Sequence, residues 1–226
     1  MLELTDWSVR RGSRVVLSEL FLKIRPGEVV GLAGPSSGGK SSLLLSIGGR
    51  LEGCGGTARW RRQVVDLRDP ALRSRVELVS EAGLGAASLT IREHLAYHAA
   101  ARNLDEPDLD GALREAGLSK LADQVVATLS SGIQERLLLA RAVLNRPSLV
   151  LIDHPLAHLD AVGEMILASW IERCRDRGAS VMWACTDKGR LRSYCDRLLI
   201  LASGSLSDSP SEAGWRGQVA AQGTGT

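Results

Sequence analysis

A glycine-rich stretch at residues 34–41 constrains the fold more than any other feature of this chain. It reads GPSSGGKS and satisfies the pattern GxxxxGK(S/T). The apolar run GEVVGLA precedes it, and SSLLLSIGGRL, with apolar residues at helical spacing, follows it. This context predicts a strand, a tight loop and a helix. The glycines allow the backbone N–H groups to face a polyphosphate, and the N-terminus of the helix adds a positive dipole end.

The same motif assigns individual contacts to ATP and Mg²⁺. Lys40 is expected to reach the β- and γ-phosphates, and the Ser41 hydroxyl is expected to ligate Mg²⁺. The alternative is an ordinary glycine-rich turn before a helix, which the combination of Lys40, Ser41 and the flanking pattern disfavours. The predicted phosphate-binding residues are Gly34, Pro35, Ser36, Ser37, Gly38, Gly39, Lys40, Ser41 and Ser42.

A carboxylate that fits beside this loop follows a second apolar run, LVLID, which ends at Asp153. An aspartate at the end of a buried strand can hold Mg²⁺ through water. Taken alone, such an aspartate is more often a loop-forming residue. Together with Lys40 it is predicted to be a metal ligand.

The order of apolar patterns predicts an α/β fold with an inserted helical block. Alternating patterns at the start indicate antiparallel strands, and residues 89–144 turn helical. Strand-like runs then alternate with the amphipathic stretch 162–175, which is typical of a parallel sheet. The predicted units are a nucleotide-binding core with a β subdomain (1–82 and 146–205), a helical subdomain (83–145) and a flexible polar tail (206–226).

The segment LSSGIQ at residues 129–134, followed by the helical ERLLLARAVL and then by LVLID, resembles the signature of ABC-type ATPases, usually LSGGQ. The resemblance extends over about residues 1–205: LTIREHL is similar to the entry of the family's helical subdomain, and AHLD, ending at Asp160, to its D-loop. It implies a P-loop core with an antiparallel β subdomain and a helical subdomain. Two such chains would pair head to tail around two ATP molecules.

In that arrangement the signature of one chain completes the ATP site of the other. The resemblance places Ser130, Ser131 and Gly132 against the γ-phosphate held by a partner. Ser131 departs from the family's glycine and adds a Cβ where the backbone approaches phosphate. The segment also fits a plain helix N-cap made by Ser130 or Ser131, and the two interpretations are compatible.

Three positions that the family uses for hydrolysis are altered here. His154 replaces the glutamate that orients the attacking water, and Thr186 replaces a histidine that contacts the γ-phosphate. Glu81 replaces a glutamine that contacts Mg²⁺ and relays nucleotide state to the membrane-spanning partner. The resemblance therefore implies an ATPase, converting ATP and water to ADP and phosphate, whose own site is weakened.

Other candidate residues have weaker support. Arg11 aligns with the aromatic residue that stacks on adenine in the family, and a solvated loop arginine is an equally good reading. His94 and His98 share a helix face at i, i+4, and without a third ligand nearby we expect them on the surface.

The altered positions serve the chain's own ATP site, whereas Ser130 and Gly132 would serve a partner's. We therefore expect a second ABC nucleotide-binding subunit, a paralogue rather than a second copy, together with membrane-spanning transporter subunits. The chain would be cytoplasmic and held at the inner membrane face through these partners. A net charge of +2 gives no indication of nucleic acid binding. The alternatives are a fully active homodimeric transport ATPase and an ATP-controlled structural or interaction module outside transport.

Overall fold

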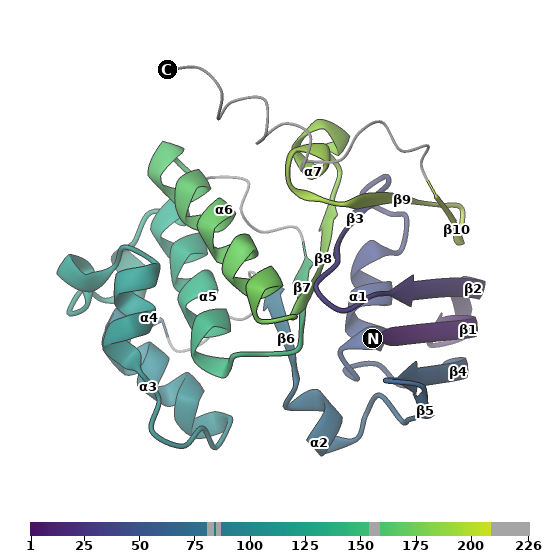
Figure 1. The fold of residues 1–226 in the computed structure, drawn as a ribbon, viewed down its shortest axis with the longest axis horizontal. Coiled ribbons are helices and arrows are strands. Elements are labelled where there is room, and N and C mark those ends of the chain that lie inside the picture. Colours follow the sequence, from purple (N-terminus) through teal and green to yellow (C-terminus); the bar gives the residue numbers. More distant parts are fainter. Residues whose placement is uncertain (81–83, 85–86, 154–158, 209–226) are drawn as a thin grey trace.

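The computed structural model describes residues 1–80, 84, 87–153 and 159–208, and Figure 1 shows its course. The strands are β1 (Leu2–Arg11), β2 (Arg14–Ile24), β3 (Val29–Ala33), β4 (Cys54–Trp60), β5 (Gln63–Val64), β6 (Val76–Ser80), β7 (Leu149–Asp153), β8 (Ser180–Cys185), β9 (Arg197–Ala202) and β10 (Ser205–Asp208). The α-helices are α1 (Lys40–Ile47), α2 (Pro70–Arg73), α3 (Ile91–Ala101), α4 (Leu109–Glu115), α5 (Ser131–Asn145), α6 (Ala161–Asp176) and α7 (Lys188–Tyr194). Two 3₁₀ turns, η2 (Ser119–Leu121) and η3 (Val126–Thr128), lie before α5.

The strands form two sheets. The smaller sheet is antiparallel, in the order β2-β1-β4-β5, and it contains the strand pair that the alternating patterns of residues 2–9 and 15–24 predict. The larger has the order β10-β9-β3-β8-β7-β6 and is parallel except for β10. In a parallel sheet the carboxyl ends of the strands share one edge, which is where α/β proteins bind ligands. The carboxyl ends of β3, β6, β7 and β8 therefore share this edge.

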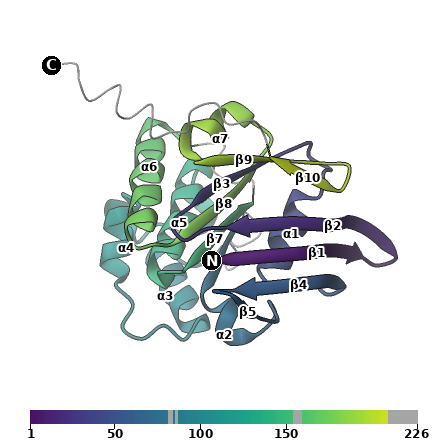
Figure 2. The same cartoon turned by 45° about the vertical axis from the view of Figure 1, so that its right-hand side comes forward.

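Two hydrophobic cores hold the sheets in place. Helix α1 lies between the sheets and contacts both β1 and β7. Its buried Leu43, Leu44 and Ile47 share one core with the inward side chains of the antiparallel sheet. The opposite face of the parallel sheet is covered by helices, including α5 and α6, which form the second core. Figure 2 shows α1 behind β1 and β2, and α3, α4, α5 and α6 on the other side of β7.

Helices α3, α4 and α5 form a helical lobe beside the parallel sheet (Figure 1). Helix α3 begins with a capping box, in which Thr90 accepts from the backbone N–H of Glu93 and the Glu93 carboxylate accepts from that of Thr90. The expectation that His94 and His98 lie on the surface is wrong, because they are only 3% and 8% exposed. The helix face that they share is therefore buried inside the protein.

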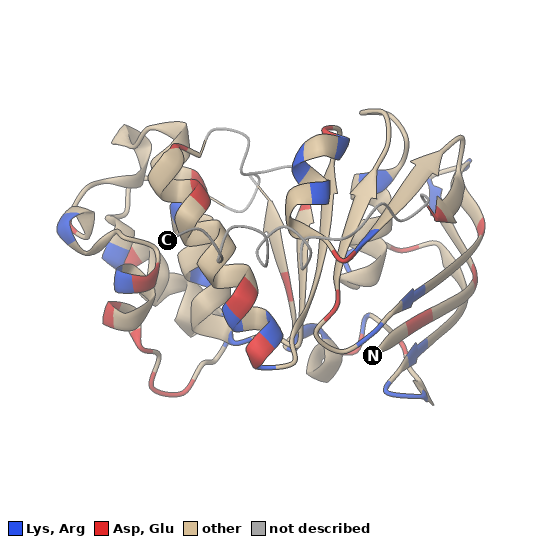
Figure 3. Ribbon diagram, turned by 45° about the horizontal axis from the view of Figure 1, so that its top comes forward, with Lys and Arg blue, Asp and Glu red and all other residues tan. Residues whose placement is uncertain are grey.

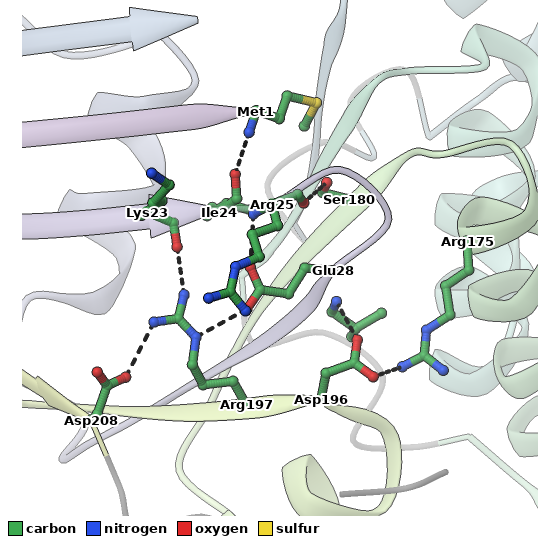
Figure 4. Close-up of polar contacts among 11 residues, drawn as sticks. Met1, Lys23, Ile24, Arg25, Glu28, Arg175, Ser180, Asp196, Arg197 and Asp208 are labelled. Carbon is green, nitrogen blue, oxygen red and sulfur yellow. Dashed lines mark hydrogen bonds and ion pairs between the residues drawn. The ribbon is translucent and has the colours of Figure 1, made fainter. Parts of the chain in front are cut away.

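Charged side chains of both signs occur in the helical lobe and on the sheets (Figure 3). One group ties the two sheets together at the amino ends of the parallel strands (Figure 4). Arg197 on β9 donates to Glu28 at 3.0 Å and to the main-chain oxygen of Lys23. Asp196 accepts from the backbone N–H of Val29 and from Arg175, both at 2.9 Å. These contacts fix β3 and β9 relative to the antiparallel sheet.

The predicted flexible tail begins too early. Strand β10 runs to Asp208 and pairs antiparallel with β9, with Leu206 opposite Leu201. Residues 206–208 are therefore part of the sheet, and residues 209–226 lie outside the described part of the chain.

Candidate phosphate-binding site

The backbone of the loop after β3 is arranged so that only glycine fits at two of its positions. Gly34 has φ +154, and a Cβ there would lie 2.2 Å from the main-chain oxygen of Leu201. Gly39 has φ +94 and a Cβ would lie 2.8 Å from Leu17. Both positions are ones that L-residues adopt only with strain. Gly38 donates its backbone N–H to the oxygen of Pro35 at 2.9 Å, which closes the turn.

The amino end of α1 is open to an anion. Its N-cap is Gly39, so no side chain caps the helix, and its first turn contains no acidic residue. The first N–H groups of an α-helix have no partner within the helix. They carry the positive end of the helix dipole, which favours phosphate.

Lys40 lies at this helix end with its ammonium group folded over the loop. Its side chain donates to the main-chain oxygens of Gly34 and Pro35, at 2.8 and 2.7 Å, and the residue is 3% exposed. Burial lowers the pKa of Lys40, and the nearby Asp153 carboxylate acts in the opposite direction. A positive charge is thus held beside the open helix end.

Ser41 and Asp153 come together at the same edge of the sheet. The Ser41 hydroxyl donates to Asp153 Oδ1 at 3.0 Å, although 112 residues separate them in the sequence. Hydroxyl and carboxylate oxygens are the kind of ligand that Mg²⁺ prefers in proteins. Ser41 and Asp153 are therefore chemically suited to hold Mg²⁺, which would neutralise phosphate charge there. No cluster of three His, Cys, Asp or Glu side chains that could hold a metal without ATP occurs among the described residues.

Two of the altered positions, Glu81 and His154, fall outside the described residues, whereas the residue before each of them is described. In the sheet, Ser80 at the end of β6 pairs with Asp153, and Glu81 follows Ser80 in sequence. His154 directly follows Asp153. Glu81 and His154 themselves are not described. Thr186 follows β8, which lies beside both β3 and β7, and its side chain is exposed.

The signature residues lie apart from the phosphate loop, at the start of α5. Ser130 occupies the N-cap position, but its side chain makes no capping hydrogen bond. Ser130 and Ser131 are exposed, and Gly132 is half-buried. Within the described residues, no hydrogen bond or ion pair joins these three residues to the phosphate loop. The N-terminus of α5 thus presents its serine hydroxyls to solvent.

The two remaining predicted residues have simple local settings. Arg11 is the last residue of β1 and is exposed. Exposure is compatible both with stacking on adenine and with a solvated arginine. Asp160 is the N-cap of α6, where its carboxylate accepts from the backbone N–H of Gly163 at 2.7 Å. Neither side chain makes a described contact with the phosphate loop.

A buried polar cluster that no sequence motif indicates is centred on Glu77, which is 1% exposed. Glu77 accepts from Arg102 and, at 3.0 Å, from Asn145. His98 Nε2 and an Arg141 Nη lie 3.8 and 4.0 Å from its other oxygen. The sequence offers one signal for it, a glutamate inside the otherwise apolar strand run VELVS. A charge in such a run requires partners in the fold.

Within the described residues, no helix combines the length and apolar character needed to span a bilayer.

Comparison with known proteins identifies the family of this chain. Residues 17–157 match the family model described as ABC transporter. The hemin import ATP-binding protein HmuV of Pseudomonas aeruginosa is 31% identical over 214 residues, which span 90% of this chain and 84% of that protein. The cytochrome c biogenesis ATP-binding export protein CcmA of Bordetella bronchiseptica is 34% identical over 194 residues, 85% of each chain.

Solved structures show the same fold. A structure described as the ATP-binding subunit of an ABC transporter superposes with a TM-score of 0.83 at 25% identity, covering 92% of this chain and 89% of that one. The dimeric cassette MJ0796, bound to ADP and Pi, superposes with a TM-score of 0.80 at 22% identity and covers 96% of this chain and 99% of that one. The fold predicted from the sequence, a P-loop core with an antiparallel β subdomain and a helical subdomain, is confirmed. With the family model covering most of its sequence and a relative 31% identical over nine-tenths of its length, this chain belongs to the ABC transporter family.

Proposed function

We propose that this chain binds ATP with Mg²⁺ and acts as one nucleotide-binding subunit of a membrane transport complex. Closure of two such subunits around ATP would be passed to membrane-spanning partners at the cytoplasmic face of the membrane. The observation that carries the proposal is the contact of Ser41 Oγ with Asp153 Oδ1 at 3.0 Å, next to the open end of α1 and the Lys40 ammonium. The relatives include one named for import and one named for export, so the direction of transport is left open.

When ATP binds, the site residues would exchange their present hydrogen-bond partners for phosphate oxygens of the nucleotide. Lys40 now donates to two loop carbonyls, and a polyphosphate in the loop would offer charged acceptors in their place. Ser41 and Asp153 would together hold Mg²⁺, which supplies charge neutralisation on the phosphates. The open N–H groups of α1 would receive a phosphate oxygen.

Hydrolysis at this site is proposed to be weak. His154 stands where the family has the glutamate that positions the attacking water, and positioning of a general base is typically worth about 10²–10⁴ in rate. Thr186 offers a short neutral hydroxyl where the family has a histidine, and Glu81 adds a negative charge where it has glutamine. Each change leaves the phosphate loop intact, so binding is retained.

A paralogous subunit would then supply the missing groups. The exposed hydroxyl of Ser130, which makes no cap of its own, supports a signature that completes the partner's ATP site. In such an asymmetric dimer the partner's site hydrolyses ATP and this chain's site holds it. A functional complex that contains only this nucleotide-binding chain would contradict the asymmetric arrangement and favour the homodimer.

The first test is retention of labelled ATP with Mg²⁺ by the purified chain, with the retained nucleotide identified afterwards. We expect intact ATP, and no retention by Lys40→Ala. In a parallel experiment His154→Glu should convert bound ATP to ADP roughly tenfold or more faster than the wild type. A wild-type chain that already produces ADP at a Lys40-dependent rate, unchanged by His154→Glu, would refute weakened hydrolysis and leave a conventional transport ATPase.

The alternative function outside transport is that of an ATP-controlled structural or interaction module, and it predicts a different result. Such a chain would function without membrane-spanning partners. Isolation of the chain from its own cells in a complex that contains no membrane protein would favour it.

A further inference from the structure

A cleft of about 360 Å³ lies at one end of the antiparallel sheet, where β1 begins, β2 ends and β4 turns into β5. Met1, Leu2 and Pro26 give this cleft an apolar part. Arg25, which also lines it, lies between the end of β2 and the amino end of β3 (Figure 4). The phosphate loop follows the carboxyl end of β3, at the opposite edge of the parallel sheet. The cleft is therefore separate from the ATP site.

The rim of this cleft carries an excess of positive charge. Five of its lining residues are basic and exposed, namely Lys23, Arg25, Arg59, Arg61 and Arg62. Glu3 is the one acidic side chain among the described residues of the lining, and it pairs with Lys23 at 2.5 Å. The side chains of the four arginines make no hydrogen bond or ion pair with a described residue. Their charge is therefore available to an anion.

Arg61 and Arg62 form the two-residue turn between β4 and β5. Trp60 pairs with Gln63 across this turn, and the two arginines have positive φ angles of 50° and 73°. A turn with positive φ at both positions is best filled by Asn-Gly, and arginine is strained there. The backbone N–H of Arg61 donates to the main-chain oxygen of Met1 at 2.8 Å, which fixes the turn against β1. The geometry of the turn gives no reason for two arginines, and strained positions of this kind cluster at binding sites.

Two bulky apolar side chains stand beside these charges on the outward face of the sheet. Phe21 alternates with buried leucines on β2 and is 64% exposed, and Lys23, two residues further along, faces the same way. Across the sheet Lys23 lies opposite Glu3, and Glu3 lies opposite Arg59. Val64 on β5, which is 65% exposed, lies opposite Arg59. The five cations, Phe21 and Val64 thus form one exposed surface, called the basic face below.

We propose that the basic face docks on the surface of an anionic phospholipid bilayer. The lipid phosphates would face the arginines, and Phe21 and Val64 would enter the region between the headgroups and the acyl chains. Proteins that lie on a bilayer combine these two kinds of side chain, because anionic headgroups attract the cations while the apolar side chains leave water. A soluble anion would engage the arginines and leave Phe21 and Val64 in water. The presence of a bilayer beside this chain rests on the proposed function, whereas the anionic character of the occupant does not.

The distribution of charge along the sheet sets the orientation of this contact. The exposed carboxylates of β1 and β2, Asp6 and Glu19, lie nearer the middle of these strands than the cleft does. An anionic surface repels these carboxylates and attracts the turn with Arg61 and Arg62. The end of the sheet that carries this turn would therefore approach the bilayer most closely.

The test measures co-sedimentation of the full chain, without nucleotide, with two kinds of vesicle. One kind contains phosphatidylserine and phosphatidylcholine, and the other contains phosphatidylcholine alone. We expect binding to the first kind only, and we expect it to weaken as salt is added.

The informative variant is Arg61→Asn with Arg62→Gly. It removes two charges and gives the turn the residues that its backbone prefers, so its Tm should not fall. Its binding to the anionic vesicles should weaken about thirtyfold, because each basic residue near such a surface contributes about fivefold. Phe21→Ser should weaken the same binding about tenfold through lost apolar burial.

The matched control is Arg10→Ser with Arg14→Ser. It removes the same charge from the exposed β1–β2 hairpin, at the other end of the same sheet. Binding to the anionic vesicles should be unchanged.

Four outcomes would overturn the proposal. Vesicles without phosphatidylserine bind equally well, or the control pair weakens binding as much as the turn pair, or Phe21→Ser binds as the wild type does, or no vesicle binds. In the last case, a labelled polyglutamate peptide that binds the wild type but not the turn variant would identify an acidic protein segment as the occupant. Repeating the measurement on Lys40→Ala separates this test from that of the proposed function, because vesicle binding should survive the loss of ATP retention.

Discussion

Replacing Glu77 by glutamine removes the one negative charge at the centre of a cluster that joins β6, α3 and α5. The Glu77 side chain is 1% exposed, and those of Arg102 and Arg141 are 16% and 11% exposed. The substitution keeps the size of the side chain and one carbonyl oxygen. It removes the carboxylate charge that faces the partly buried guanidinium groups of Arg102 and Arg141.

The expected cost follows from these contacts. Breaking a buried ion pair by neutralising one member typically costs about 3–5 kcal/mol. Arg102 keeps two main-chain acceptors, the oxygens of Arg73 and Val76, both at 3.2 Å, which reduces the loss. We therefore expect Glu77→Gln to lower the free energy of unfolding by about 2–3 kcal/mol. For a chain of this size that is a fall in Tm of about 4–12 °C.

Urea unfolding followed by circular dichroism measures this change in the free energy of unfolding. We expect the urea concentration at the midpoint to fall and the m value to stay the same. The matched control is Glu3→Gln. Glu3 pairs with Lys23 at 2.5 Å, but the two side chains are 38% and 64% exposed, so solvent screens the pair and its loss should lower the urea midpoint much less than Glu77→Gln does. A Glu77→Gln protein as stable as the control would show that water already solvates the arginines and that the cluster is not a buried ion pair.

Three further predictions concern the same lobe and the phosphate site. Burial lowers the pKa of His94 to about 4 and of His98 to about 3, against 6.5 when unfolded. The unfolded chain therefore binds protons that the folded chain excludes. The free energy of unfolding should fall as the pH is lowered from 6.5 to about 4, by up to about 1.4 kcal/mol per pH unit for each histidine. Urea midpoints measured at several pH values should depend less steeply on pH in the double variant His94→Gln with His98→Gln. Gly34→Ala places a Cβ 2.2 Å from a main-chain oxygen and should abolish ATP retention in a filter-binding assay, whereas Gly55→Ala, with open space around it, should not. Ser41→Ala should retain ATP to an extent that no longer rises with Mg²⁺ in a metal titration, and a response equal to that of the wild type would contradict the role of this hydroxyl.

The sequence predicted the glycine-rich loop between a strand and a helix because the determinants of that loop are local. The glycines, Lys40 and Ser41 lie within eight residues, and Gly34 and Gly39 adopt backbone conformations that strain other residues. Asp153 could be added because an apolar run that ends in a carboxylate indicates a strand end, and strand ends of a parallel sheet share one edge. The contact between Asp153 and Ser41 then follows from topology.

The burial of His94 and His98 could not be predicted in the same way. A spacing of i, i+4 places two residues on one helix face but does not say whether that face meets solvent or protein. The partner of His98 is Arg141, which donates to its Nδ1 at 3.1 Å from 43 residues away. Strand β10 was missed for a related reason. Its four residues, SLSD, contain a single apolar side chain, and only their pairing with β9 makes them a strand.

The proposed site, which would bind ATP but hydrolyse it weakly, would have a thermodynamic consequence. A nucleotide can shift an equilibrium between open and closed dimers only by its difference in affinity for the two states. If this site holds intact ATP, it favours closure for as long as ATP remains bound, and hydrolysis at a partner's site must supply the opposing step.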